Sequence, residues 1–208
     1  MPKRSIIYID GFNLFYGALK GTKYKWLNLE RYFTLLRQDD TIQEIKYFTA
    51  MLDGQKKLKQ EIYLLALETL PKVNIYFGKF KTKKVNCTIK DCNYSGDRLF
   101  NVPEEKRTDV NIAIHMLNDA VSDRCERLVL VSGDSDLVPA LHMIKNVTPQ
   151  KEIIVYIPAR SVVRGAAVEL RGSADKDRIL PNNLLAKAQF PQKIPDGMGG
   201  TITKPEKW

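Results

Sequence analysis

The sequence predicts a three-layer α/β fold in which helices cover both faces of a central, mostly parallel sheet of five or six strands. Short apolar runs rich in Ile, Val, Tyr and Phe recur along the 208 residues, and stretches with helical spacing separate them. Because these runs are continuous rather than alternating, each strand is expected to be buried on both faces. Alternation of strands with helix-length connections is typical of parallel α/β sheets.

The expected elements follow one another along residues 1–190, which we interpret as one domain. Strands are expected at residues 6–9, 45–49, 73–77, 128–131 and 153–157. Helices are expected where apolar residues recur three or four positions apart, at residues 29–36, 58–67, 110–120 and 137–144. Residues 79–102 are a lysine-rich insertion that contains two cysteines, and residues 191–208, rich in Pro, Gly and Lys, are expected to form a flexible tail.

The composition excludes several classes of protein. The apolar runs are far shorter than the roughly 20 residues that a membrane-crossing helix needs, so we expect no membrane association. The three cysteines have no disulfide framework, and no secretory leader pattern opens the chain, so we expect a cytoplasmic protein. The net charge of +9 favours a polyanionic partner, and the excess of Lys and Arg lies almost entirely in residues 1–100.

Carboxylates gather where the predicted strands end. Asp10 follows the first strand, and Asp109 lies in the first turn of the third helix. Asp134 and Asp136 follow the fourth strand. Open parallel sheets bind ligands outside the carboxyl ends of their strands, so we expect these side chains to line one crevice. Their charges repel unless a proton or cation neutralises them, and carboxylate and water oxygens are the ligands that Mg²⁺ and Mn²⁺ prefer.

Each of these residues also has a purely structural interpretation. Asp10 and Asp134 stand in ordinary turn sequences beside glycine, and Asp134 can cap the helix that follows it. Asn13 either binds a ligand or caps the helix after the first strand. The neighbouring Phe12 and Tyr16 either stack on unpaired bases or pack beneath that helix. No G-x-x-x-x-G-K-[ST] or G-x-G-x-x-G motif occurs, so nucleotide binding by such a loop is not predicted.

The insertion carries a second charged surface. Lys79, Lys81 and Lys83 alternate with uncharged residues and would line one face of a strand that begins at the edge of the acidic crevice. A polyanion can lie along such a row, although a row of charges is also typical of a solvated face. Cys87 and Cys92 are compatible with half of a zinc site, but a structural zinc takes four ligands, so free thiols on a hairpin are the alternative.

Three short motifs contain the acidic residues. They are Tyr8-Ile-Asp10-Gly-Phe-Asn13-Leu-Phe-Tyr16-Gly, Glu105-Lys-Arg-Thr-Asp109-Val-Asn-Ile-Ala and Val131-Ser-Gly-Asp134-Ser-Asp136-Leu-Val-Pro. In this order they resemble the NYN domain family, which belongs to the PIN-like nucleases. The resemblance extends over nearly all of the predicted domain, but the lysine-rich insertion is not part of the family's minimal pattern.

The resemblance implies a PIN-like fold and a Mg²⁺ or Mn²⁺ centre that hydrolyses RNA. The family's catalytic and metal-binding acids correspond here to Asp10, Asp109, Asp134 and Asp136, with Asn13 as an accessory catalytic residue. The candidate contacts to RNA, single-stranded or structured, are Lys79, Lys81, Lys83, Lys84 and Arg107.

Two other hypotheses stay open. One is a regulatory module that keeps the fold, binds RNA or another protein and cleaves nothing. The other is a nuclease that acts on DNA, because nothing in the sequence identifies a contact to a 2′-hydroxyl group. Formation of a homodimer, and the choice between one metal ion and two, are also left open.

Overall fold

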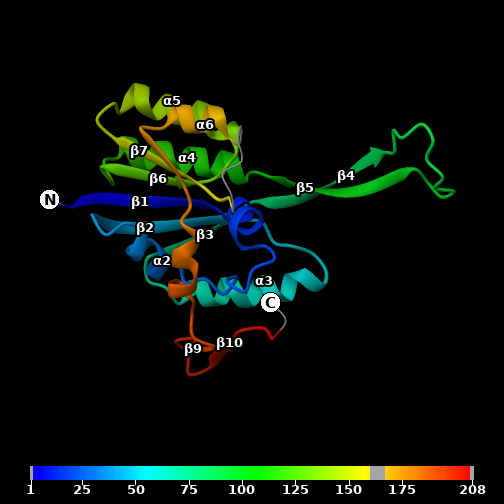
Figure 1. The fold of residues 1–208 in the computed structure, drawn as a ribbon, viewed down its shortest axis with the longest axis horizontal. Helices are drawn as coiled ribbons and strands as arrows, with labels where there is room; N and C mark the ends of the chain where they lie inside the picture. The colour runs from blue at the N-terminus through cyan, green and yellow to red at the C-terminus, as the bar shows by residue number, and fades with distance from the viewer. Residues whose placement is uncertain (1, 160–166, 207–208) are drawn as a thin grey trace.

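The computed structural model describes residues 2–159 and 167–206 of the chain (Figure 1). Its centre is a six-stranded sheet in the order β3-β2-β1-β6-β7-β8, and every neighbouring pair of strands is parallel. The strands are β1 (Lys3–Asp10), β2 (Asp40–Thr49), β3 (Val73–Phe77), β6 (Arg127–Val131), β7 (Glu152–Ile157) and β8 (Lys176–Ile179). The predicted α/β fold with a parallel sheet of five or six strands is confirmed.

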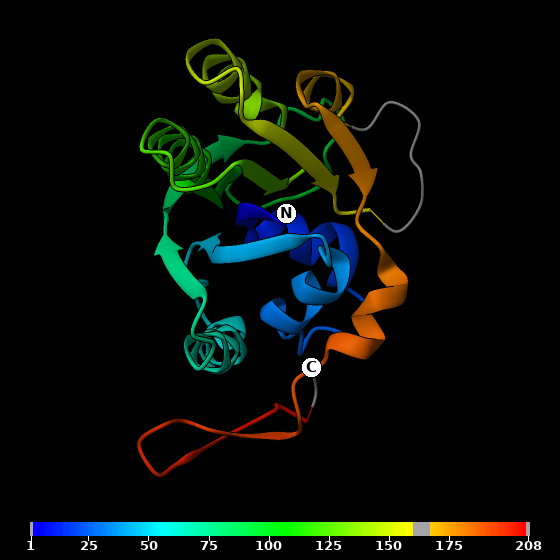
Figure 2. The same ribbon diagram turned by 90° about the vertical axis from the view of Figure 1, so that its left-hand side faces the viewer.

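Helices cover both faces of this sheet, as the view in Figure 2 shows. One face packs against the π-helical turn η1 (Phe15–Leu19), α2 (Leu29–Leu36), α3 (Gln55–Glu68) and the 3₁₀ segment η3 (Asn182–Ala188). The other face packs against α4 (Thr108–Val121), α5 (Val138–Val147) and α6 (Val168–Ser173). Two short turns, α1 (Gly11–Leu14) and η2 (Ser135–Leu137), follow the ends of β1 and β6. No helix within the described residues is both long and apolar enough to cross a membrane.

The central strand β1 shows why the sequences of the strands are continuous apolar runs. Ile7 and Ile9 belong to the core under α2 and α3, whereas Ile6 and Tyr8 belong to the core under α4 and α5. All four side chains are fully buried, because successive residues of a strand point to opposite faces and both faces are covered. The strand is thereby fixed between two cores, and its end at Asp10 lies at the carboxyl edge of the sheet.

A buried ionic network ties α4 to the sheet. Lys46 of β2 lies 2.6 Å from Asp119 of α4, and their side chains are almost completely buried. The Tyr8 hydroxyl donates to the same carboxylate at 2.8 Å, and Arg124 donates to it at 2.7 Å and to Glu44 of β2 at 2.8 Å. Every charge of the network thus has a partner, as burial requires.

The insertion folds as a two-stranded antiparallel ribbon that projects from the body (Figure 1). Its strands are β4 (Lys79–Asn86) and β5 (Leu99–Lys106), so the ribbon continues four residues past the predicted boundary at residue 102. Most of its side chains are exposed. At its root, Phe80 packs edge-to-face against Phe12 of α1 at 5.7 Å between ring centroids. The ribbon therefore begins at the carboxyl edge of the sheet.

The chain after residue 190 forms a second, shorter ribbon of β9 (Lys193–Pro195) and β10 (Thr201–Thr203). The Trp26 indole donates to the carbonyl oxygen of Pro191 at 2.8 Å, and Ile194 is buried in the core under α3. The flexibility expected of residues 191–208 stays a prediction, but part of this segment packs on the domain.

The buried ion pair gives a testable stability prediction. Lys46→Met leaves the Asp119 carboxylate short of a buried partner, so we expect the free energy of unfolding to fall by about 3 kcal/mol in urea denaturation at pH 7. The control is Lys57→Met on the surface of α3, where the ammonium lies 3.7 Å from Glu61. That substitution should cost less than about 1 kcal/mol. Equal losses from the two substitutions would contradict this account of the buried pair.

Candidate active site

Asp10 ends β1 and is 3% exposed. Its two carboxylate oxygens accept hydrogen bonds from the backbone N–H of Asn13 at 2.9 Å and from the Asn13 side-chain amide at 2.6 Å. Burial raises the pKa of Asp10, and the two bonds from Asn13 oppose that rise. Asp10 is thus both the N-cap of α1 and a carboxylate with a fixed orientation.

The loop after β6 lies against Asp10. The Asn13 amide oxygen accepts a hydrogen bond from the backbone N–H of Gly133 at 3.1 Å, so Asn13 bridges the ends of β1 and β6. Ser132 is fully buried, donates to Asp10 at 3.4 Å and accepts from the backbone N–H of Asp134 at 3.1 Å. This arrangement gives Ser132 and Asn13 a positioning role, and it holds the loop that carries Asp134 beside Asp10.

Asp134 and Asp136 occupy the turn that leads into α5. The Asp134 carboxylate accepts from the backbone N–H of Asp136 at 3.0 Å, which caps η2 as the structural interpretation predicted. This bond uses only one oxygen of Asp134. Asp136 itself is exposed.

Asp109 lies in the first turn of α4 and is half-buried. Burial is the largest cause that raises the pKa of Asp109, to about 6. Repulsion from three carboxylates adds to the rise, in the order Asp134, Asp10 and Asp136. The structure therefore brings the four acids predicted from the sequence within electrostatic reach of one another, from three separate segments of the chain.

Glu105 is a fifth acid of this crevice, and the sequence reasoning assigned it no role. It lies near the end of β5, where the Thr108 hydroxyl donates to its carboxylate. Burial raises the pKa of Glu105 to about 7; the bond from Thr108 opposes the rise, and the charges of Asp10 and Asp109 add to it. In the sequence, the one clue to this role was that Glu105 stands four residues before Asp109. The path of the ribbon, which the sequence does not give, is what turns Glu105 toward the crevice.

These acids suit a hard divalent cation by their chemistry. They are oxygen donors, and neighbouring carboxylate charges add to the rise in the pKa of Asp10, Glu105 and Asp109, which means that the crevice holds more negative charge than its own hydrogen bonds offset. Within residues 2–159 and 167–206, no three acidic, histidine or cysteine side chains surround one point closely enough to hold a metal ion. These five acids are thus neighbours at the carboxyl edge of the sheet, a cluster that we call the acidic crevice, and they do not form a closed coordination shell.

The candidate RNA contacts lie on and beside the ribbon. Lys79, Lys81 and Lys83 alternate along β4 as predicted, and they are exposed together with Lys84 and Arg107. Arg107 precedes α4 and adopts a left-handed backbone conformation, with φ of 81°. Lys79 and Arg107 stand at the root of the ribbon, next to the crevice, whereas Lys83 and Lys84 lie farther out along β4. The row of lysines therefore leads away from the acids.

The two cysteines of the insertion follow β4. Cys87 and Cys92 are free thiols in the connection between β4 and β5. Among the residues that the structure describes, neither belongs to a group of three metal-ligating side chains. The zinc hypothesis therefore gains no support from this geometry.

Comparisons with known proteins agree with this fold. The family model of the NYN domain matches residues 4–179. A crystal structure of a protein of unknown function from Vibrio parahaemolyticus superposes with a TM-score of 0.56 at 18% sequence identity, covering 88% of this chain and 95% of that one. At that identity the likeness concerns the fold alone.

A curated relative is similar along the whole chain. It is the 6-hydroxy-3-succinoylpyridine 3-monooxygenase HspA of Pseudomonas putida (strain DSM 28022 / S16), with 32% identity over an alignment 240 positions long. The alignment covers 100% of this chain and 76% of the relative.

The shifted carboxyl of Glu105 predicts a pH-dependent gain in stability for Glu105→Gln. At a pH below the ordinary value of about 4.5, the carboxyl is neutral in both folded and unfolded protein, so the substitution should have little effect. As the pH rises from 4.5 through about 7, the carboxyl ionises in the unfolded protein but stays protonated in the folded wild type, so the wild type loses stability until the folded carboxyl ionises too. We expect Glu105→Gln to become progressively more stable than the wild type in that window, in urea denaturation with EDTA.

The matched control is Glu104→Gln on the same strand. The Lys106 ammonium lies 2.8 Å from the Glu104 carboxylate and lowers its pKa, so removing this charge should give no gain at any pH. If both variants followed the same pH course, Glu105 would have no special place in the crevice.

Proposed function

Because the chain belongs to the NYN domain family, we propose that it is a metal-dependent ribonuclease whose acidic crevice holds Mg²⁺ or Mn²⁺. One observation carries the proposal: carboxylates from the end of β1, the start of α4 and the loop after β6 come together, and their repulsion adds to the rise in the pKa of Asp10 and Asp109. Such convergence is costly to a fold, and it is typical of sites that bind a cation or move a proton.

Asp10, Asp109 and Asp134 would hold the cation, with Asp136 and Glu105 beside them. A divalent cation held there supplies a Lewis acid that activates water for attack on phosphorus and stabilises the departing oxygen. The chain's other residues orient these ligands. Asn13 and Ser132 fix the Asp10 carboxylate through hydrogen bonds, and the same two residues bond the backbone of the loop that carries Asp134. The substitution of either should therefore disturb two ligands together.

The ribbon supplies the contacts to the substrate backbone in this proposal. Its lysines bind phosphates without reading sequence, and they lead a strand of RNA toward the crevice at the ribbon's root. We place the activity in the cytoplasm, because the few cysteines form no disulfide framework.

The curated relative favours a second candidate function. That protein is named a monooxygenase of a pyridine compound, and it aligns with all of this chain at 32% identity. Oxygenation of a small pyridine derivative, with molecular oxygen and an electron donor, is therefore the alternative to phosphodiester hydrolysis.

The deciding experiment compares both reactions in one preparation. Purified protein is incubated with matched single-stranded RNA, structured RNA and DNA, in Mg²⁺, Mn²⁺ or EDTA. We expect cleavage of RNA with either metal and none in EDTA, and a loss of at least about 100-fold in Asp134→Asn, because a lost metal ligand removes several kcal/mol of transition-state stabilisation. The control Asp53→Asn removes an exposed carboxylate that lines no part of the crevice and should cleave normally.

The same preparation is also given 6-hydroxy-3-succinoylpyridine, oxygen and, as the electron donor, a reduced nicotinamide dinucleotide. Consumption of the pyridine compound without any cleavage of RNA would replace the ribonuclease proposal with the oxygenase. Faster cleavage of DNA than of RNA would support the proposed hydrolysis but make DNA the substrate. Equal cleavage by Asp134→Asn and wild type would remove the crevice from the reaction.

The lysine row predicts a change in the salt dependence of RNA binding. Replacing Lys79, Lys81 and Lys83 together by Gln should weaken binding equally for unrelated RNA sequences, and it should lower the slope of log K against log salt by about one per lost phosphate contact. Fluorescence anisotropy with EDTA measures both effects. The control replaces Lys187, Lys193 and Lys204, which lie away from the ribbon. An unchanged slope in the ribbon variant would exclude these lysines from RNA binding.

A further inference from the structure

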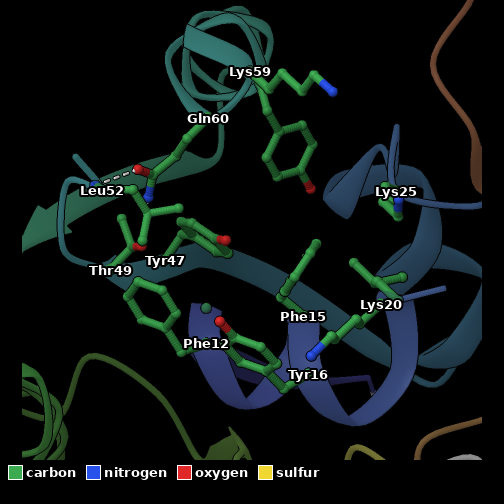
Figure 3. A pocket seen from close by; sticks show the side chains of 13 residues that line it. Phe12, Phe15, Tyr16, Lys20, Lys25, Tyr47, Thr49, Leu52, Lys59 and Gln60 are labelled. Atoms are coloured by element: carbon green, nitrogen blue, oxygen red, sulfur yellow. Dashed lines mark hydrogen bonds between the residues drawn. The ribbon is translucent and has the colours of Figure 1, made fainter. Parts of the chain in front are cut away.

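A cavity of about 300 Å³ lies at the carboxyl end of β2 (Figure 3). Its walls come from α1 and η1 on one side, from α3 on the other, and from the end of β2 between them. Aromatic rings form much of its lining, and Lys20, Lys25 and Lys59 also line it. None of the described residues that line it is acidic, so its charge is opposite to that of the crevice.

One wall of the cavity consists of neighbouring aromatic rings with a lysine ammonium at one end. The rings of Phe12 and Tyr16 stack with 6.3 Å between centroids and an interplanar angle of 20°, and Phe15 meets Tyr16 edge-to-face at 5.3 Å. The Lys20 ammonium lies 4.8 Å above the ring of Tyr16. Tyr16 is 52% exposed, so packing beneath the helix does not account for it. A flat ring placed here can stack, and a negative group attached to it can reach the ammonium.

The opposite wall is held in place by Gln60 of α3. Its side-chain amide donates to the carbonyl oxygen of Ala50 at 2.9 Å and to the Thr49 hydroxyl at 3.2 Å. Its amide oxygen accepts from the backbone N–H of Leu52 at 2.8 Å, the bond drawn in Figure 3. Gln60 thus fastens α3 to the chain that leaves β2. The cavity is therefore formed before any ligand arrives, which lowers the entropic cost of binding.

Tyr47 joins the cavity to the acidic crevice. It lines the cavity, and burial followed by the charges of Asp10 and Glu105 raises its pKa. Gly11, which follows Asp10, also lines the cavity and lies so close to Tyr47 that a Cβ there would be 2.7 Å from the tyrosine hydroxyl. The two sites therefore share a wall, and only glycine allows that approach.

We propose that this cavity binds a planar aromatic ring that carries an anionic group, with the ring against Tyr16 and the anion near Lys20. Two sources supply this chemistry, namely a nucleotide with its phosphate and a small aromatic carboxylic acid. The cavity's volume is at the lower end of the range for ligand pockets and suits one ring with a few further atoms. The inference goes beyond the proposed nuclease, because binding in the cavity needs neither a cation nor cleavage.

The test is calorimetric titration of the intact protein in EDTA with UMP, uridine, nicotinate, pyridine and inorganic phosphate. We expect UMP or nicotinate to bind at least about fivefold more tightly than the matching compound without the anion, and phosphate alone to bind weakly. Tyr16→Ala and Lys20→Ala should each weaken binding by about tenfold, whereas Tyr16→Phe should retain it because the ring remains.

Two matched controls separate the cavity from the general surface. Tyr94→Ala removes a tyrosine of similar exposure outside the cavity, and Lys23→Ala removes a lysine that also lies over a tyrosine ring, at 5.7 Å from its centroid. Neither should change binding. Tighter binding of UMP than of nicotinate would assign the cavity to nucleotides, and the reverse would assign it to small aromatic acids.

The proposal is overturned by three results. They are absence of binding by both anionic ring compounds at millimolar concentration, equal binding of the uncharged rings, and equal loss in the control variants. Because every titration contains EDTA and no cleavable bond is needed, a negative ribonuclease assay leaves these outcomes unaffected.

Discussion

The placement of α4 depends on a charge pair buried where the helix crosses the sheet. Lys46 and Asp119 lie 2.6 Å apart and both are buried away from water. The helix therefore cannot slide or rotate without separating two buried charges. Apolar packing tolerates small shifts, whereas an ion pair with hydrogen bonds from Tyr8 and Arg124 has one geometry. The same helix carries Asp109 ten residues earlier, and its position relative to Asp10 follows from that geometry.

Most of the sheet could be predicted because burial on both faces gives β1, β2, β6 and β7 continuous apolar runs, and the edge strand β3 has a similar run although it is only partly buried. The edge strand β8 was not predicted, since its residues are exposed or only partly buried and three of the four are charged. The four predicted acids follow from the rule that ligands bind beyond the carboxyl ends of parallel strands. Glu105 does not, because its nearness to Asp10 depends on how the ribbon leaves and rejoins the body, which no local pattern encodes.

Charges of opposite sign meet along the carboxyl edge of the sheet. The acidic crevice, the root of the lysine row of β4 and the cavity with Lys20, Lys25 and Lys59 all lie at this edge, where Phe80 of β4 contacts Phe12 of the cavity wall. An anionic ligand that touches either basic surface is therefore held close to carboxylates that would repel it without a cation. The net charge of +9 therefore does not describe how an anionic ligand meets this protein, because acidic and basic side chains lie next to each other along this one edge.

The ribbon also marks where the chain divides. Strands β1, β2 and β3 precede it and form one half of the sheet, whereas β6, β7 and β8 follow it and form the other half. Within the sheet the two halves pair through β1 and β6, and Asp10 belongs to the first half while Asp109 and Asp134 belong to the second. A break at the ribbon's tip would thus yield two fragments, each with a contiguous three-stranded sheet and neither with a complete set of acids, as in a split reporter whose signal returns only when its parts reassemble.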